Sequence, residues 1–242
     1  MSLANQVWIT SALSDKDVSN TLCLLISLRK TYTSRKLIVV VSEKVSTFNL
    51  KVLLHASDHL LFANEIWNTA GLKLDDFVKL FVLTLKSFQT CVYLSPTNLA
   101  IKNCDDIFDQ PCLPPGFIGV SDDELSSLLV RPSPEVFDDL MKALSYNDRS
   151  VASFVSDWIK NRFRSPSNLA EGKYFARLMT KADLNSCKEI NASIYNIVDV
   201  PIGTDLEDLD FLSNLIVTTR NQIYNHDVQP LLASLTPNHV NK

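Results

Sequence analysis

Short apolar runs, several of them rich in β-branched residues, alternate with amphipathic segments from the start of the chain to Leu94. The continuously apolar run at 36–42 is typical of a strand that is buried on both faces of a parallel sheet. Alternating strands and helices predict right-handed βαβ units, and therefore an α/β fold. The expected strands are 6–11, 36–42, 59–62 and 90–94, and the expected helices are 15–32, 47–54 and 74–88.

The pattern becomes less regular after residue 100. The segment 103–115 contains three prolines and no periodicity, so we expect a loop there. Two strands that lie close together in sequence then indicate a mixed sheet. We expect strands at 117–120, 126–131, 193–198 and 215–219, and helices at 134–144 and 150–163. No linker or internal repeat interrupts the chain, so 1–242 is predicted to be a single domain.

Composition and charge exclude several classes of protein. The chain has 242 residues, a net charge of −4 and a pI near 5.6, so no basic excess is available to neutralise nucleic-acid phosphates. Its apolar runs are too short to span a membrane, and no secretory signal is visible. Five cysteines, without a C-x-x-C pair, indicate reduced thiols. We therefore expect a cytoplasmic protein that binds neither nucleic acid nor membranes.

Only five glycines occur, at 71, 116, 119, 172 and 203. They form neither a G-x-G-x-x-G fingerprint nor a P-loop, so neither of these nucleotide-binding loops is present.

The segment 74–109 carries a resemblance to a known family. Its Val78-Lys79 pair, the strand Cys91-Val92-Tyr93-Leu94 and the tail at 105–109 align without a gap to glycogenin and its relatives in glycosyltransferase family 8. The resemblance is firm over 5–163 and loose over 164–242. It implies a GT-A fold, a mostly parallel mixed sheet flanked by helices, in which a nucleotide-binding half and an acceptor side share one continuous sheet. Members of this family bind a nucleotide sugar, often UDP-glucose, with manganese.

The resemblance also locates the positions where the family carries its chemistry. An Asp-x-Asp triplet that holds the metal corresponds here to Ser95, Pro96 and Thr97. Hard divalent cations need anionic oxygen ligands, and the metal neutralises the departing diphosphate. Two neutral hydroxyls do not replace two carboxylates, so we predict no metal site and no cofactor.

Two further family motifs are altered. The segment that aligns with Asp-Gly-Gly-Asp-Gln-Gly has Ser150 and Val151 in place of its second aspartate and its glutamine. The segment 215–221 lacks the histidine, glycine and Lys-Pro of the family's His-x-x-Gly-x-x-Lys-Pro motif. Thr10, Ser11 and Lys79 remain as candidate residues of a residual ligand-binding groove. Lys79 could bind a phosphate as a point charge or lie solvated on a helix face.

Simultaneous loss of these motifs predicts a catalytically inactive, glycosyltransferase-like pseudoenzyme. We expect it to be a protein-interaction or scaffolding module, alone or as a subunit of a larger complex, with a protein partner. Because glycogenin-like proteins dimerise, the resemblance also implies a possible homodimer. We do not expect a nucleotide sugar to bind. The alternatives are a metal-independent glycosyltransferase and a protein that binds nucleotide sugars or carbohydrate.

Overall fold

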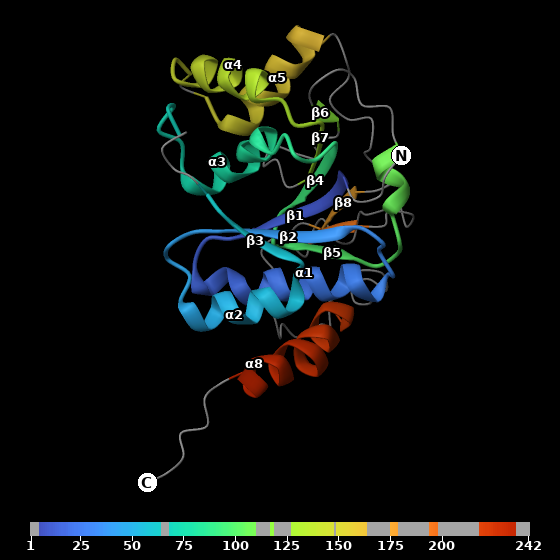
Figure 1. Cartoon of the computed structure of the whole chain (residues 1–242). Helices are drawn as coiled ribbons and strands as arrows, with labels where there is room; N and C mark the ends of the chain where they lie inside the picture. Colours follow the sequence, from blue (N-terminus) through green and yellow to red (C-terminus); the bar gives the residue numbers. More distant parts are fainter. Residues whose placement is uncertain are drawn as a thin grey trace.

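A computed structural model describes residues 5–63, 68–109, 117–118, 127–147, 149–163, 175–178, 194–197 and 218–235. In these residues a mixed sheet lies between two layers of helices (Figure 1). The sheet has six strands in the order β3-β2-β1-β4-β7-β6. Its strands are β1 (Gln6–Ala12), β2 (Lys36–Val41), β3 (His59–Phe62), β4 (Thr90–Leu94), β6 (Phe117–Ile118) and β7 (Ser127–Val130).

The first four strands of this sheet are parallel. β1 pairs with β2 on one side and with β4 on the other, and β2 pairs with β3. β7 runs antiparallel to β4, and β6 runs antiparallel to β7. The predicted α/β fold with a mostly parallel, mixed sheet is therefore confirmed.

A second sheet was not predicted. It has three strands in the order β5-β9-β8, with bounds β5 (Asn98–Ala100), β8 (Phe175–Leu178) and β9 (Ile194–Ile197). β5 begins only four residues after β4 ends, so the chain leaves the main sheet immediately. The expectation of one continuous sheet is wrong for the described strands, which form two.

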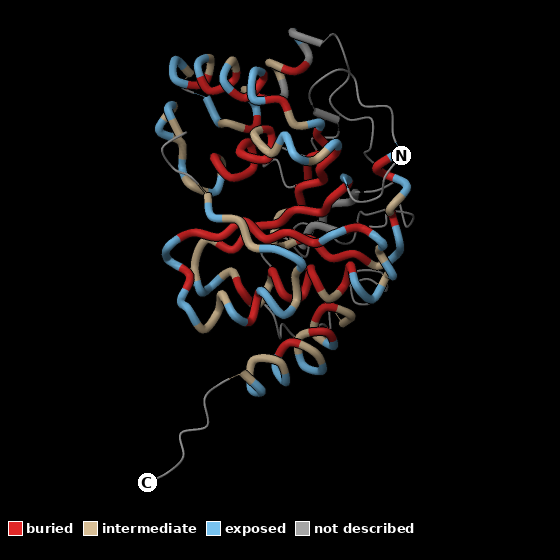
Figure 2. The backbone as a smooth tube through the Cα atoms, viewed as in Figure 1, coloured by how far each residue is buried: buried red, intermediate tan, exposed pale blue. Residues whose placement is uncertain are grey.

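Helices cover both faces of the main sheet. α1 (Val18–Lys30) and α2 (Thr47–Ala56) lie on one face, and α3 (Leu74–Phe81), α4 (Pro134–Leu144) and α5 (Val151–Phe163) lie on the other (Figure 1). Successive side chains of a strand point to opposite faces. Trp8 accordingly belongs to the core beneath α1, whereas Val7 and Ile9 belong to the core with α3 and α4. The central strands are buried along their whole length (Figure 2).

The predicted helix 74–88 ends earlier than expected. α3 stops at Phe81 and continues as a 3-10 turn, Val82–Thr84. The Thr84 hydroxyl donates to the Phe81 carbonyl over 2.8 Å, satisfying a carbonyl at the helix end. The chain can then turn back toward the start of β4.

The C-terminal part of the described chain is helical, not extended. Residues 218–223 are helical, followed by a π-turn (Tyr224–Val228) and α8 (Gln229–Leu235). The predicted strand 215–219 is therefore wrong at 218–219, and 215–217 lie outside the described residues. Ile223 and Val228 are buried in the core beneath α1. Tertiary packing against α1 therefore determines that this segment is helical. The wide turn precedes Pro230, whose ring would clash with a regular helical carbonyl.

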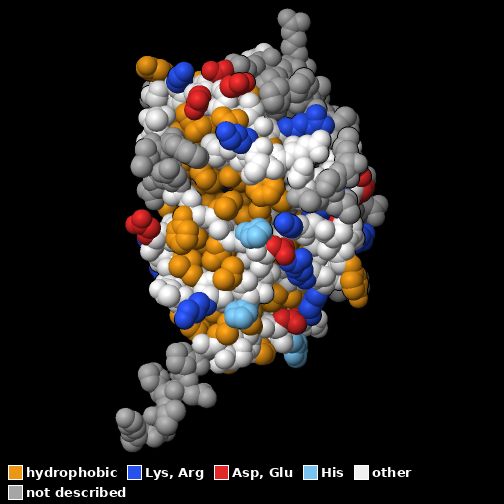
Figure 3. Space-filling model, viewed as in Figure 1, with side chains coloured by type: hydrophobic (Ala, Val, Ile, Leu, Met, Phe, Trp, Pro, Cys, Tyr) orange, Lys and Arg blue, Asp and Glu red, His pale blue; other side chains and the backbone are white. Residues whose placement is uncertain are grey.

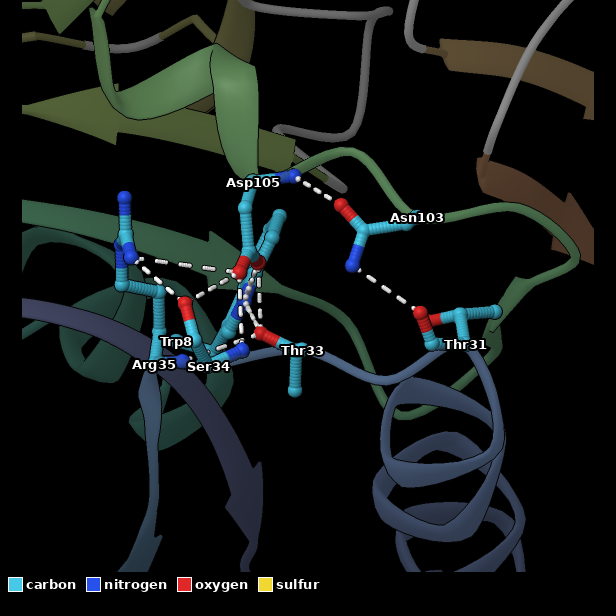
Figure 4. Close-up of polar contacts among 7 residues, drawn as sticks. All are labelled: Trp8, Thr31, Thr33, Ser34, Arg35, Asn103 and Asp105. Carbon is cyan, nitrogen blue, oxygen red and sulfur yellow. Dashed lines mark hydrogen bonds and ion pairs between the residues drawn. The ribbon is translucent and has the colours of Figure 1, made fainter.

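Asp105 links the chain after β5 to the turn between α1 and β2 (Figure 4). Its carboxylate accepts hydrogen bonds from the Trp8 indole (3.4 Å), the Thr33 hydroxyl (2.5 Å) and the Ser34 amide (2.8 Å). The Arg35 guanidinium lies 4.0 Å from the same carboxylate. Asp105, the first residue of the segment on which the family resemblance partly rests, thus has a structural role here.

No helix in the described parts of the chain combines the length and apolar character needed to cross a membrane.

Candidate functional site

The carboxyl ends of β1, β2 and β4 meet at one edge of the main sheet, called here the strand-end edge. It comprises the segments 10–17, 42–46 and 94–97 together with the first turns of α3. Strand order reverses between β1 and β4, because β2 and β3 continue to one side and β4 to the other. Ligands in open α/β sheets bind at such a reversal. The strand-end edge is therefore the place to test the predicted groove residues.

Ser95, Pro96 and Thr97 form a tight turn at the end of β4. The Ser95 and Thr97 hydroxyls are hydrogen-bonded to each other over 3.0 Å, and the Asn98 amide donates to the Ser95 carbonyl over 2.9 Å. Both side chains are neutral, and each already has a partner. This set of oxygens does not fit a manganese ion, which needs anionic ligands.

Thr10 and Ser11 point to opposite faces of β1. The Ser11 hydroxyl lies 3.0 Å from the hydroxyl of Tyr93 on β4. Burial raises the pKa of the Tyr93 phenol well above its usual range, so the phenol stays neutral. Thr10 instead lines a small apolar void beneath α1, and its hydroxyl has no hydrogen-bond partner. The two predicted groove residues therefore do not face one common ligand.

Lys79 lies on α3 and is only 7% exposed. Its ammonium group lies 2.7 Å from the Asp75 carboxylate and 3.6 Å from that of Asp76. Both aspartates are in the first turn of α3, where the helix dipole favours negative charge. Lys79 is thus neither solvated nor a free point charge, and the three groups together carry a net charge of −1.

The loop after β1 is held by its own side chains. Asp17 accepts hydrogen bonds from the Leu13 amide (3.0 Å) and from the amide (2.8 Å) and hydroxyl (3.0 Å) of Ser14. The Ser42 hydroxyl at the end of β2 donates to the Leu13 carbonyl over 2.6 Å. These contacts join the ends of β1 and β2 to each other.

Asp15 connects the same loop to α2. Hydrogen bonds from the side chain of Asn49 and from the Ser46 amide, the latter 2.8 Å long, hold the pKa of the Asp15 carboxyl below its usual range. The Asp15 carboxylate therefore binds the start of α2, whereas the Asp17 carboxylate binds the backbone of its own loop.

Ser150 and Val151 begin α5 on the other face of the sheet from α1. Ser150 is exposed, and its hydroxyl accepts a hydrogen bond from the Ser153 amide over 3.3 Å, as a helix-capping residue does. Val151 packs against the core of α3 and α4. Both positions therefore have structural roles. Asp148, beside them in sequence, lies outside the described residues.

The sequence analysis did not identify the side chains that bind Lys79 and Asp17. Asp75 precedes Lys79 by four residues, a spacing that favours ion pairing on a helix, and Ser14 precedes Asp17 by three, as in a capping box. These local pairs could have been found. Among the residues that the structure describes, no group of three or more His, Cys, Asp or Glu side chains is positioned to hold a metal ion.

Solved structures define the class to which this architecture belongs. The ligand-free bifunctional glycosyltransferase WbbM superposes with a TM-score of 0.67 at 13% identity, covering 94% of this chain and 52% of that protein. The galactosyltransferase LgtC in complex with donor and acceptor sugar analogues gives 0.55 at 10% identity, covering 95% and 96%. The chain has the GT-A fold of glycosyltransferases, as predicted.

Sequence comparison points in the same direction over part of the chain. Human glycogenin-2 is 29% identical over 119 residues, covering 46% of this chain and 24% of the relative. Glycogenin-1 of Caenorhabditis elegans is 29% identical over 116 residues, covering 44% and 27%. The matches thus span about a quarter of these relatives, and no protein-family model matches the chain. Over the part of the chain that these matches cover, its sequence is glycogenin-like.

Proposed function

We propose that this chain is a catalytically inactive glycosyltransferase-like protein that serves as a protein-interaction or scaffolding module. The observation that carries the proposal is the chemistry at the end of β4. There the Ser95 and Thr97 hydroxyls are hydrogen-bonded to each other, and residues 95–97 include no carboxylate. Departure of a nucleoside diphosphate requires stabilisation of its developing charge, usually a dominant catalytic contribution. The residues at this strand end supply no such charge and no anionic ligand for a cation.

The charge around Lys79 supports the same proposal. A diphosphate that approached this lysine would also approach Asp75 and Asp76, which together outweigh its single positive charge. Electrostatic repulsion would oppose binding of the anion. The described residues beneath this edge nevertheless form buried cores on both faces of the sheet, with Trp8 on one face and Phe77 on the other. Binding to another protein requires a folded surface but no catalytic residues. A second copy of this chain is one candidate partner.

Thermal unfolding in the presence of UDP, UDP-glucose and manganese tests the inactive strand-end edge. A ligand at 100 times its dissociation constant stabilises a protein by about 2.7 kcal/mol. We expect no change in Tm with any combination of the three, and no release of UDP from UDP-glucose. A manganese-dependent rise in Tm, or measurable turnover, would overturn the proposal.

The alternative, a metal-independent protein that binds nucleotide sugars through Lys79, predicts a different result. It requires a rise in Tm with UDP alone that the Lys79→Met variant abolishes. The binding role is tested separately by light scattering on the purified chain, where a concentration-dependent mass above 27.2 kDa identifies self-association. A strictly monomeric chain would exclude the homodimer.

A further inference from the structure

A surface pocket lies at the end of the main sheet opposite the strand-end edge. Lys86 precedes β4, and Pro134 follows β7, which runs antiparallel to β4, so both residues belong to that opposite end. The pocket has a volume of about 440 Å³, within the range of small-molecule sites. Its lining includes Thr84, Lys86, Pro134, Phe137, Asp138 and Lys142.

The inner wall of the pocket is apolar and packs against the core. Phe137 is 4% exposed, and its ring lies edge-on to that of Phe77, with centroids 6.3 Å apart. Phe77 contacts Phe81 in turn, at 5.9 Å. Pro134 occupies the first turn of α4, where its ring fixes the backbone. A preformed aromatic wall binds a flat apolar group without the cost of ordering itself.

The rim of the pocket is charged and predominantly basic. Lys86 and Lys142 are both exposed, and neither forms an ion pair with another described residue. Asp138 lies one helical turn before Lys142 on α4 and is the opposing charge. Among the lining residues that the structure describes, two ammonium groups and one carboxylate give a net charge of +1 around an apolar wall. In the view of Figure 3, apolar side chains gather on the surface between the levels of α4 and β3.

We propose that this pocket binds an aromatic monoanion, with its ring against Phe137 and Pro134 and its negative group between Lys86 and Lys142. Charge complementarity selects an anion over a cation, and the aromatic wall selects a flat ring over an aliphatic chain. The pocket is distinct from the strand-end edge. This proposal is therefore independent of the proposed loss of catalysis.

Three probes that share one ring system separate charge from apolar contact: 2-naphthoate, 2-naphthylmethanol and 2-naphthylmethylammonium. Titration is followed by ¹H–¹⁵N NMR on the full chain. We expect 2-naphthoate to bind most tightly, with shifts at the amides of α4 and of the turn before β4. UDP should not compete. Failure of 2-naphthoate to bind, or equal affinity for all three probes, would overturn the assignment.

Variants then test the roles of the charged residues. The double variant Lys86→Gln and Lys142→Gln should lose about tenfold or more in affinity for 2-naphthoate, as expected for a charge-assisted hydrogen bond, while 2-naphthylmethanol binds unchanged. Asp138→Asn should bind 2-naphthoate more tightly. The matched control replaces two exposed lysines outside the pocket, Lys36→Gln and Lys102→Gln, and should behave as the wild type. If both double variants lost the same affinity for 2-naphthoate, the loss would reflect the net charge of the protein and not a contact in the pocket. That result would overturn the proposed site.

Discussion

Two buried threonines show how differently a hydroxyl can contribute to stability. The Thr21 hydroxyl on α1 lies 2.9 Å from the Ser11 carbonyl and 3.0 Å from that of Asp17, so it joins the helix to the end of β1. The Thr10 hydroxyl faces the leucines of α1 without a partner. A buried polar group without a hydrogen bond costs about 1–3 kcal/mol.

Thr10→Val should therefore raise the free energy of unfolding by about 1 kcal/mol, since valine keeps the branched shape and removes the unsatisfied hydroxyl. Thr21→Val should lower it by about 1 kcal/mol, because it deletes a satisfied donor and leaves two carbonyls without it. Urea denaturation at neutral pH measures both. If Thr10→Val were destabilising, the hydroxyl would have a partner that the structure does not show.

At the strand-end edge, the sequence identifies residue types but not their partners. The loss of carboxylates at Ser95 and Thr97 can be read directly from the chain. The bond between Ser11 and Tyr93 joins residues 82 positions apart, so no local pattern could predict it. Thr10 was predicted to line a groove because it ends a strand, but the register of β1 turns it toward α1.

At the scale of elements, Asp58 connects a helix and two strands. Its carboxylate accepts hydrogen bonds from the Arg29 guanidinium (2.6 Å) and the Leu37 amide (2.7 Å), and its own amide donates to the Leu37 carbonyl over 2.8 Å. Burial raises the pKa of the Asp58 carboxyl, but the Leu37 amide and Arg29 lower it by more, so that it lies below its ordinary value. The ends of α1, β2 and β3 are thereby held together.

This connection predicts a dependence of stability on pH. A carboxyl whose pKa is lower in the folded state stabilises the fold above its unfolded pKa, and this contribution is lost as the pH falls through the folded pKa. Asp58→Asn should reduce the free energy of unfolding at pH 7 by about 1 kcal/mol, because the site is partly exposed and asparagine still accepts a hydrogen bond.

The difference between wild type and Asp58→Asn, from urea denaturation, should shrink as the pH is lowered below the ordinary aspartate value of 3.8. Asp109→Asn is the control: Asp109 is exposed and forms no ion pair among the described residues, so its effect should stay within about 0.5 kcal/mol. A pH-independent effect of Asp58→Asn would contradict this prediction, because it would show that the negative charge of Asp58 does not supply the stabilisation.

Element prediction succeeded where the pattern is local and failed where tertiary contacts decide. β3 and α4 have the predicted bounds because a short apolar run and a proline-initiated amphipathic helix each carry their own signal. β5 was missed, since its three residues become a strand only by pairing with Ile194–Ile197. The helical turn at 218–223 was missed because its apolar residues are too few to show a helical period without α1 beside them.

At the scale of the whole molecule, buried thiols report on the integrity of both layers. Cys91 lies on the central strand β4, Cys23 lies on α1 in the same core as the C-terminal helix, and Cys104 lies beside the Asp105 contacts. Each is at most 2% exposed. Burial raises the pKa of the Cys23 thiol to about 12 and those of Cys91 and Cys104 further still. Because the thiolate is the reactive form, these groups should be inert in the folded state.

Labelling with Ellman's reagent at pH 8 tests this in a variant that retains only these three cysteines, with Cys112→Ser and Cys187→Ser. We expect no fast reaction in buffer and complete reaction of all three thiols in concentrated urea. In moderate urea the three should react at one common rate, because the helices on both faces share the six-stranded sheet and should open together with it. Mass spectrometry of the labelled peptides resolves the three positions. Fast modification of Cys23 while Cys91 stays protected would contradict this expectation, since it would mean that the layer of α1 and the C-terminal helix separates from the sheet by itself.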